Sequence, residues 1–331
     1  MPQNQRAERN RTLTLTQSEL IAYSKRLKRL QAKASLHDIE NCILHNDLFE
    51  VLDFLPEACV DLLILDPPYN LNKSFNGKTF KARTTAEYIA YLESWLPKLL
   101  KTLKSTASLY LCGEWRMSAA LQLILEKYLI VRNRITWERE KGRAARRNWK
   151  NCSEDIWFCT VSDDYVFNAD AVKLKRKVLA PYRENGLPKG WVETAEGNFR
   201  LTAPSNLWTD ITVPFWSMPE NTEHPTQKPE KLIAKLILAS SNEGDLIFDP
   251  FLGSGTTAVV AKKLNRRFVG IEREKFYACL AAKRLDLAEQ DKTIQGYYDG
   301  VFWERNSLRA IAKHPSSKSL AHTCAIDFLQ T

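Results

Sequence analysis

Residues 246–257, LIFDPFLGSGTT, decide the fold that this sequence predicts. The apolar run at their start is typical of a buried strand, and the loop with two glycines opens a helical pattern over 254–264. Glycine lets a backbone turn sharply and approach a ligand closely. The next apolar run, 268–271, ends at Glu272, whose carboxylate is suited to a ribose diol. Ala258 stands where a dinucleotide fingerprint has its third glycine, so a pyrophosphate ligand is not favoured.

The same alternation continues on both sides of this stretch. Strand-like apolar runs lie at 42–45, 60–65, 107–112, 130–137 and 155–160, and helical patterns lie at 86–103, 115–128, 229–241 and 274–289. A basic amphipathic helix is expected over 17–34, with Thr16 and Glu19 as its capping box. Between about 161 and 223 the periodicity fails, which indicates an insert with a role of its own. We therefore expect an α/β fold with a doubly wound, mostly parallel sheet and one small insert.

The composition excludes several classes of protein. Within 331 residues there is no apolar stretch long enough to span a membrane, and the polar, arginine-bearing start is unlike a signal peptide. The 7 cysteines are scattered without a CxxC pair, which argues against a disulfide framework and a structural zinc site. Together these features predict a globular protein of a reducing compartment, the cytoplasm, with no membrane partner and no metal.

The net charge of +9 is concentrated in three blocks. Residues 1–40 carry +4, residues 132–150 carry +6 and residues 173–200 carry +4, which leaves the remainder at −5. Aromatic residues such as Trp149 and Trp191 stand among the cations of the last two blocks. A single basic run is most simply a solvated face, but three runs favour an extended surface for a polyanion.

A second motif, Asp66-Pro67-Pro68-Tyr69-Asn70, directly follows the strand-like run 60–65. Its simplest interpretation is a strand ended by a rigid proline turn. In a functional interpretation, the prolines fix the Asp66 carboxylate and the next carbonyl as a pair of acceptors beside an aromatic ring. An exocyclic amino group of a base has two hydrogens for such a pair, and its ring could stack on Tyr69.

Taken together, these two motifs resemble those of the amino-group DNA methyltransferases that use S-adenosylmethionine. Their order, with residues 66–69 first and the loop 249–255 later, is similar to that of the circularly permuted beta class. Residues 224–229, HPTQKP, resemble the segment that precedes the cofactor loop, and Asn46-Asp47 resembles the family's carboxylate near the adenine. Residues 206–210, NLWTD, also resemble a family segment, so the likeness covers about 40–290. It implies the class I methyltransferase fold, circularly permuted.

The resemblance implies a set of site residues. The catalytic residues would be Asp66, Pro67, Pro68 and Tyr69. The residues that hold S-adenosylmethionine would be Asp47, Thr226, Gln227, Lys228, Asp249, Phe251, Gly253, Ser254, Gly255, Thr256 and Glu272. Arg143, Arg146, Arg147 and Lys150 would contact DNA, mostly at phosphates. The chain departs from the family at Ser153, where a histidine often precedes the glutamate, so Arg147, Asn148 and Trp149 are candidates for holding the far side of the base.

The resemblance also divides the chain and predicts its activity. The expected parts are a basic N-terminal helical extension (1–40), a catalytic half (41–160), a target-recognition insert (161–223), a cofactor-binding half (224–290) and a C-terminal tail without an assigned role (291–331). The function would be site-specific methylation of N6 of an adenine flipped out of duplex DNA. Cytosine N4 is the alternative, because an initial Asp is usual in the adenine enzymes and an initial Ser in the cytosine enzymes. A structured RNA substrate and an inactive nucleic-acid-binding module are weaker alternatives. Further expected partners are a cognate restriction endonuclease and a second copy of the chain, in a bacterial or phage-type cell and at the nucleoid.

Overall fold

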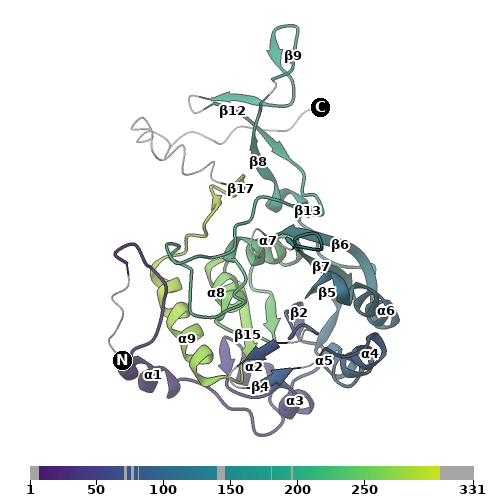
Figure 1. Cartoon of the computed structure of the whole chain (residues 1–331), viewed down its shortest axis with the longest axis vertical. Coiled ribbons are helices and arrows are strands. Elements are labelled where there is room, and N and C mark those ends of the chain that lie inside the picture. Colours follow the sequence, from purple (N-terminus) through teal and green to yellow (C-terminus); the bar gives the residue numbers. More distant parts are fainter. Residues whose placement is uncertain are drawn as a thin grey trace.

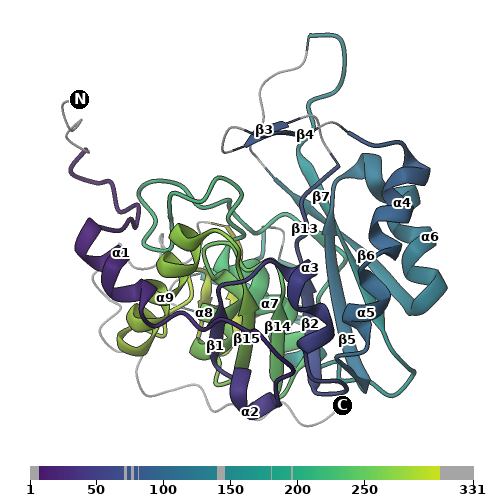
Figure 2. The same ribbon diagram turned by 90° about the horizontal axis from the view of Figure 1, so that it is seen from below.

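The computed structural model describes residues 7–70, 73–75, 78–80, 82–139, 146–179, 181–194 and 197–305. Its centre is an eight-stranded sheet in the order β1-β15-β14-β2-β5-β7-β6-β13 (Figure 2). These strands are β1 (Cys42–Leu44), β2 (Val60–Leu65), β5 (Leu103–Gly113), β6 (Ile130–Glu138), β7 (Ser153–Thr160), β13 (Leu207–Trp208), β14 (Leu246–Asp249) and β15 (Arg267–Ile271). All neighbours are parallel except β7, which is antiparallel to β5 and β6. The predicted mostly parallel sheet is confirmed, and β7 begins at the edge where β2 and β14 end.

Helices cover both faces of this sheet. One face packs against α7 (Glu230–Ser240), α8 (Thr256–Lys263) and α9 (Lys275–Gln290). The other face packs against α2 (Leu36–Ile39), α3 (Leu48–Val51), α4 (Thr85–Glu93), α5 (Leu96–Leu100) and α6 (Ser118–Tyr128). Within β2, Leu62 and Ile64 belong to the first core and Leu63 and Leu65 to the second. Because the central strands are buried on both sides, their sequences are continuously apolar, and the doubly wound arrangement is confirmed.

Two expected helices are shorter than their sequence patterns. Over 86–103, Ser94 and Trp95 lie between α4 and α5. Pro97 stands in the first turn of α5, which suits a proline better than the interior of one continuous helix. Over 17–34, α1 (Gln17–Ser24) has the predicted capping box but ends early. Residue Lys28 instead pairs with Leu44 alongside β1. Extended backbone at the sheet edge gains hydrogen bonds there, and Leu30 is buried without being helical.

The region 161–223 contains short strands rather than helices. A second sheet has the order β11-β12-β8-β17-β16 and extends from the main body (Figure 1). Its strands are β8 (Leu174–Lys177), β11 (Val192–Thr194), β12 (Gly197–Thr202), β16 (Tyr297–Tyr298) and β17 (Val301–Trp303). Of the three strands that this region contributes to the second sheet, β8 pairs with β17 from the expected C-terminal tail. The smaller elements are the hairpins β3 (Lys73–Phe75) with β4 (Lys78–Phe80) and β9 (Arg183–Glu184) with β10 (Leu187–Pro188), and the 3-10 turns Leu52–Phe54, Trp115–Met117 and Ala169–Val172.

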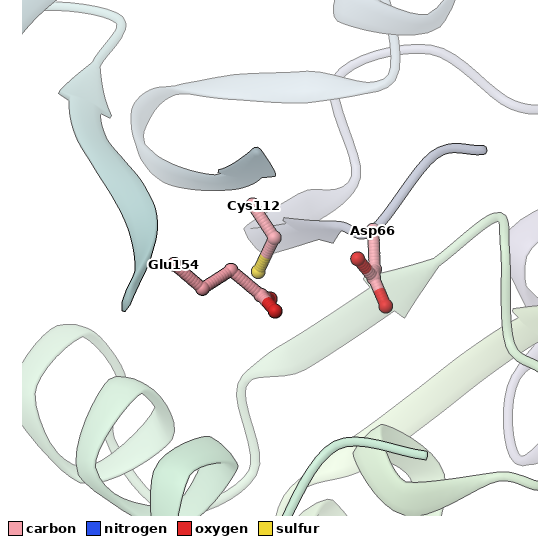
Figure 3. Close-up of side chains that lie close together, drawn as sticks. All are labelled: Asp66, Cys112 and Glu154. Atoms are coloured by element: carbon pink, nitrogen blue, oxygen red, sulfur yellow. The ribbon is translucent and has the colours of Figure 1, made fainter. Parts of the chain in front are cut away.

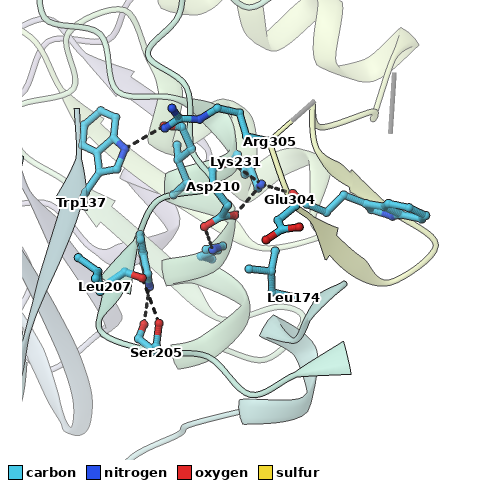
Figure 4. Close-up of polar contacts among 12 residues, drawn as sticks. Trp137, Leu174, Ser205, Leu207, Asp210, Lys231, Glu304 and Arg305 are labelled. Carbon is cyan, nitrogen blue, oxygen red and sulfur yellow. Dashed lines mark hydrogen bonds and ion pairs between the residues drawn. The ribbon is translucent and has the colours of Figure 1, made fainter. Parts of the chain in front are cut away.

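A buried ion cluster joins the second sheet to the main body (Figure 4). The Asp210 carboxylate lies 2.6 Å from the Lys231 ammonium and 2.8 Å from that of Lys235, both on α7. Lys231 also donates to the Trp303 carbonyl on β17. One lysine therefore binds a segment before α7 and a strand near residue 303 at the same time. Within the ranges described above, no helix is both long and apolar enough to cross a membrane.

Candidate active site

The loop between β14 and α8 is built around two glycines with left-handed backbone. Gly253 has φ 56° and Gly255 has φ 85°. A Cβ on Gly253 would lie 3.0 Å from His224 Nε2, and one on Gly255 would lie 2.5 Å from the Ala281 Cβ. Both positions therefore require glycine, for the backbone angle and for the close approach of a neighbour.

Side chains at the ends of two strands hold this loop. Asp249 accepts the Phe251 N–H at 3.0 Å and the Thr257 hydroxyl at 2.6 Å. Burial raises the pKa of Asp249 to about 7. Glu272, at the end of β15, accepts the Gly253 N–H at 2.8 Å. The loop is therefore preorganised by carboxylates from the same sheet edge.

Asp66, directly after β2, lies in a polar cluster with groups from four other segments. The Lys228 ammonium lies 2.7 Å from Asp66 Oδ2 and 2.8 Å from Glu154 Oε1. The Tyr69 hydroxyl donates to Glu154 Oε1 at 2.6 Å, and the Arg139 guanidinium lies 3.2 Å from the other Glu154 oxygen. Figure 3 shows the Asp66 and Glu154 carboxylates close together, with the Cys112 thiol beside that of Glu154. Two carboxylates and two cations thus balance in charge around the first residue of the DPPY motif.

The pKa values in this cluster follow from burial and from these pairs. Burial raises the pKa of Asp66, and Lys228 opposes the rise. Burial would raise the pKa of Glu154 as well, but Lys228, Tyr69 and Arg139 together outweigh it and the pKa is lowered. Burial would lower the pKa of Lys228, yet the two carboxylates raise it. Burial also raises the pKa values of Tyr69 and Cys112 well above their usual ranges, so neither is ionised at neutral pH.

One cavity connects the two motifs. Its volume is about 30 Å³. Among the predicted site residues, its lining includes Asp66, Thr226, Gln227, Lys228, Asp249, Phe251, Gly253, Ser254 and Thr256. Residues far apart in the sequence therefore meet at one place, where β2 and β14 end side by side. A larger cavity of about 450 Å³ lies between β6, α7 and the second sheet, and none of the predicted site residues lines it.

The remaining predicted residues lie around this cavity or at the loop before β7. Asp47 caps α3 through the Phe49 N–H, and its carboxylate lies 4.0 Å from Arg273, which follows Glu272. Gln227 is turned inward, with its amide donating to the Glu220 carbonyl. The side chains of Arg146, Arg147 and Lys150 are exposed between β6 and β7, whereas Arg143 lies outside the described residues.

Three supporting residues were missed by the sequence analysis. Glu154 was noted only for its unusual neighbour, although a glutamate that opens an apolar strand is a signal of a buried role. Arg139, directly after β6, forms an ion pair with Glu154. Arg284, on α9, donates to the Ser254 carbonyl and to the Thr256 hydroxyl, both at 3.0 Å. No pattern near residue 284 points to the loop, since the contact depends on how α9 packs.

The fold belongs to the class I methyltransferases. A solved structure, the cytosine-N4-specific PvuII DNA methyltransferase, matches with a TM-score of 0.53 at 18% identity, over 73% of this chain and 85% of that one. The complex of M1.HpyAVI with S-adenosylmethionine matches with a TM-score of 0.51 at 26% identity, over 74% of this chain and 98% of that one.

Sequence comparisons identify the family. A family model described as DNA methylase, for N6 and N4 enzymes, matches residues 60–283. The DNA adenine methyltransferase YhdJ of Escherichia coli is 34% identical over 74% of this chain and 83% of its own length. The type II methyltransferase M.HpaI of Haemophilus parainfluenzae is 34% identical over 74% of each chain. This chain is a member of the N6/N4 DNA methylase family, and the predicted family, enzyme class and fold are confirmed.

Proposed function

We propose that this protein transfers a methyl group from S-adenosylmethionine to N6 of an adenine flipped out of duplex DNA. The observation that carries the proposal is a cavity that is lined by both Asp66 and the glycine loop. The residues fit the cofactor, because the absence of a side chain at Gly253 leaves space beside the loop backbone. A Cβ at this position would lie 3.0 Å from His224 Nε2 and would fill that space. We assign the cofactor to the loop residues and to Asp47, Thr226 and Glu272. When bound, this cofactor supplies an electrophilic methyl group on a sulfonium.

In the proposed reaction, the protein acts by positioning and electrostatics. The Asp66 carboxylate and the Pro67 carbonyl accept the two N–H groups of the amine and direct its lone pair at the methyl carbon. The bound cofactor would supply the methyl group and leave as its neutral thioether, and Asp66 would be the first acceptor of the amine proton that is lost. Tyr69, held by its hydroxyl bond to Glu154, offers its ring to the flipped base. Flipping costs a few kcal/mol, which stacking and backbone contacts offset.

Adenine is favoured over cytosine by two observations. The motif begins with Asp66, and an initial Asp is usual in adenine enzymes. The relative YhdJ, which the chain matches over 74% of its length, is named a DNA adenine methyltransferase. Labelled methyl transfer to unmethylated duplex DNA, followed by mass spectrometry of the nucleosides, tests the assignment. We expect N6-methyladenine; N4-methylcytosine would overturn the base assignment, and no transfer on varied DNA would overturn the proposed activity.

We place the DNA-binding surface on two features of the chain. The exposed cations Arg146, Arg147 and Lys150 lie in the loop that ends where β7, with Glu154, begins. Trp149 is 93% exposed among them, which suits a ring that stacks on a base. The second sheet, with residues 161–223, is our candidate for reading the sequence. Mapping of modified bases in the DNA of expressing cells would give the recognition sequence.

We also propose a cognate restriction endonuclease as a partner, since M.HpaI is named a type II methyltransferase. The site of action would be the cytoplasm, at the nucleoid. Extracts of the source cell should then cleave unmethylated DNA at sites that this protein protects. Sedimentation would test the expected homodimer.

A further inference from the structure

The Lys228 ammonium is shared between two carboxylates, of which Glu154 is buried and Asp66 is partly exposed at 22%. It lies 2.7 Å from Asp66 and 2.8 Å from Glu154, and it also donates to the Tyr69 hydroxyl at 3.2 Å. The side chains of Lys228 and Glu154 are 9% and 3% exposed. Such a cation cannot serve both carboxylates fully, because its charge and its three donors are divided between them.

Charged and titratable groups face Asp66 from every element packed against it. They are Tyr69 after β2, Cys112 on β5, Glu154 on β7, Lys228 before α7 and Asp249 on β14. Only Lys228 among them is a cation. Arg139, the second cation of the cluster, pairs with the far oxygen of Glu154. Among the described residues, Lys228 is therefore the cation on which the ionisation of the partly exposed Asp66 depends.

An ionised Asp66 is required if it is to accept an N–H of the target amine, since a protonated carboxyl offers a donor in its place. Burial of an unpaired carboxylate costs several kcal/mol, and the incoming amine is neutral. A carboxylate has about four acceptor positions, so it can keep the ammonium while it accepts from the amine. The lysine can therefore stay in place during the reaction.

We propose that Lys228 is a positioning residue that keeps Asp66 ionised and oriented for the target amine, and that Glu154 weakens this effect by competing for the same ammonium. The inference rests on the proposed methyl transfer. It gives Lys228 a role at the methyl acceptor, whereas the family resemblance implied a role for this lysine at the cofactor.

Two variants should move the pH dependence of transfer in opposite directions. Activity falls as pH falls through the pKa of Asp66, because the protonated form does not accept. Lys228→Met removes the cation, so the acidic limb of the pH profile of transfer should move to higher pH by about one unit or more. At a pH below this limb, transfer by the variant should be about tenfold slower than transfer by the wild type. Glu154→Gln removes the competing charge and keeps an acceptor for Tyr69, so the limb should move down. Single-turnover transfer over a pH series measures both.

Matched variants separate this role from a structural one. Lys235→Met removes another buried lysine, paired with Asp210 at 2.8 Å, and should leave the limb of the pH profile in place. Lys228→Arg keeps the charge and should restore the limb toward that of the wild type. If the limb of Lys228→Met coincides with that of the wild type, or if both variants shift it in one direction, the inference is wrong.

Infrared spectroscopy gives a readout without transfer. A band of a protonated carboxyl should appear at higher pH in Lys228→Met than in the wild type, and Asp66→Asn in the same background should remove it. Failure of the wild type to methylate any DNA would overturn the proposed function and leave this titration intact. An unchanged carboxyl titration with active wild type would overturn only the role of Lys228. If Lys228→Met does not fold, the downward shift in Glu154→Gln decides alone.

Discussion

Asp66 ends a buried strand and begins a turn that two prolines hold rigid. Its variant Asp66→Ala should lower single-turnover methyl transfer by about 10³-fold or more, because the amine loses a preorganised acceptor. Cofactor affinity, measured by calorimetry, should remain, since the glycine loop is held by Asp249 and Glu272 instead. Asp53→Ala removes an exposed carboxylate paired with Lys98 and serves as the control. Loss of both transfer and cofactor binding would contradict this division of roles.

Gly255 combines a left-handed backbone with a close neighbour. In Gly255→Ala the new Cβ would lie 2.5 Å from that of Ala281, on α9. We expect a loss of unfolding free energy of about 2–4 kcal/mol, from the backbone angle and the overpacking together, and weaker cofactor binding. Gly244→Ala is the matched control, because φ is 82° there and no atom lies within 4 Å of the Cβ. Equal losses in urea denaturation would show that the contact with Ala281 carries no weight.

At the scale of elements, two acidic side chains, Glu220 and Glu230, are buried close together at the start of α7. Glu220 accepts the Glu230 N–H at 2.7 Å, and burial raises the pKa of Glu220 to about 8. Unfolding returns this pKa to its ordinary value, so the wild type loses unfolding free energy as pH rises toward 8. Glu220→Gln keeps an acceptor but not the charge. Its advantage over the wild type should therefore grow by about 1.4 kcal/mol per pH unit between about pH 5 and 8.

Chemical denaturation at a series of pH values measures this difference. The exposed Glu57 provides the control, since Glu57→Gln should give a curve parallel to that of the wild type. Parallel curves for Glu220→Gln as well would mean that Glu220 is already ionised in the folded protein.

Across the whole molecule, basic side chains and the catalytic cavity share one edge of the sheet. Replacement of Arg146, Arg147 and Lys150 by glutamine should weaken DNA binding and reduce the magnitude of the slope of log K against log salt by up to about 2.7, since each phosphate contact contributes about 0.9. Three control cations, Lys33, Lys98 and Lys101, lie near Asp53. Helix α5, which carries Lys98, directly precedes β5, so these cations lie at the edge of the sheet opposite the cavity. Their replacement should leave the slope unchanged. The proposed DNA surface is wrong if both triple variants behave alike.

The sequence predicted the main sheet well, for a physical reason. Strands buried on both faces are continuously apolar, as in β2 and β14, and turn residues mark their ends. Periodicity failed where tertiary packing decides. Leu30 repeats at helical spacing yet lies in extended backbone, because the edge of the sheet offers hydrogen bonds at Lys28.

The candidate site was predictable only where its residues form short motifs. Asp66 and Gly253 stand in such motifs, but the contact between Asp66 and Lys228 joins positions 162 residues apart. The motif containing Lys228 suggested only its neighbourhood. Contacts of this kind depend on which strand ends meet, and no local pattern records that.

The second sheet draws its strands from two distant parts of the chain. Strand β8 lies between β12 and β17, and Phe302 pairs with Leu174. An exchange of residues 161–223 with those of a relative would therefore leave the native β17 beside a foreign strand. If residues 161–223 read the DNA sequence as proposed, redesign of specificity needs both segments to be transplanted together. Synthesis of the chain must also pass β17 before this sheet is complete.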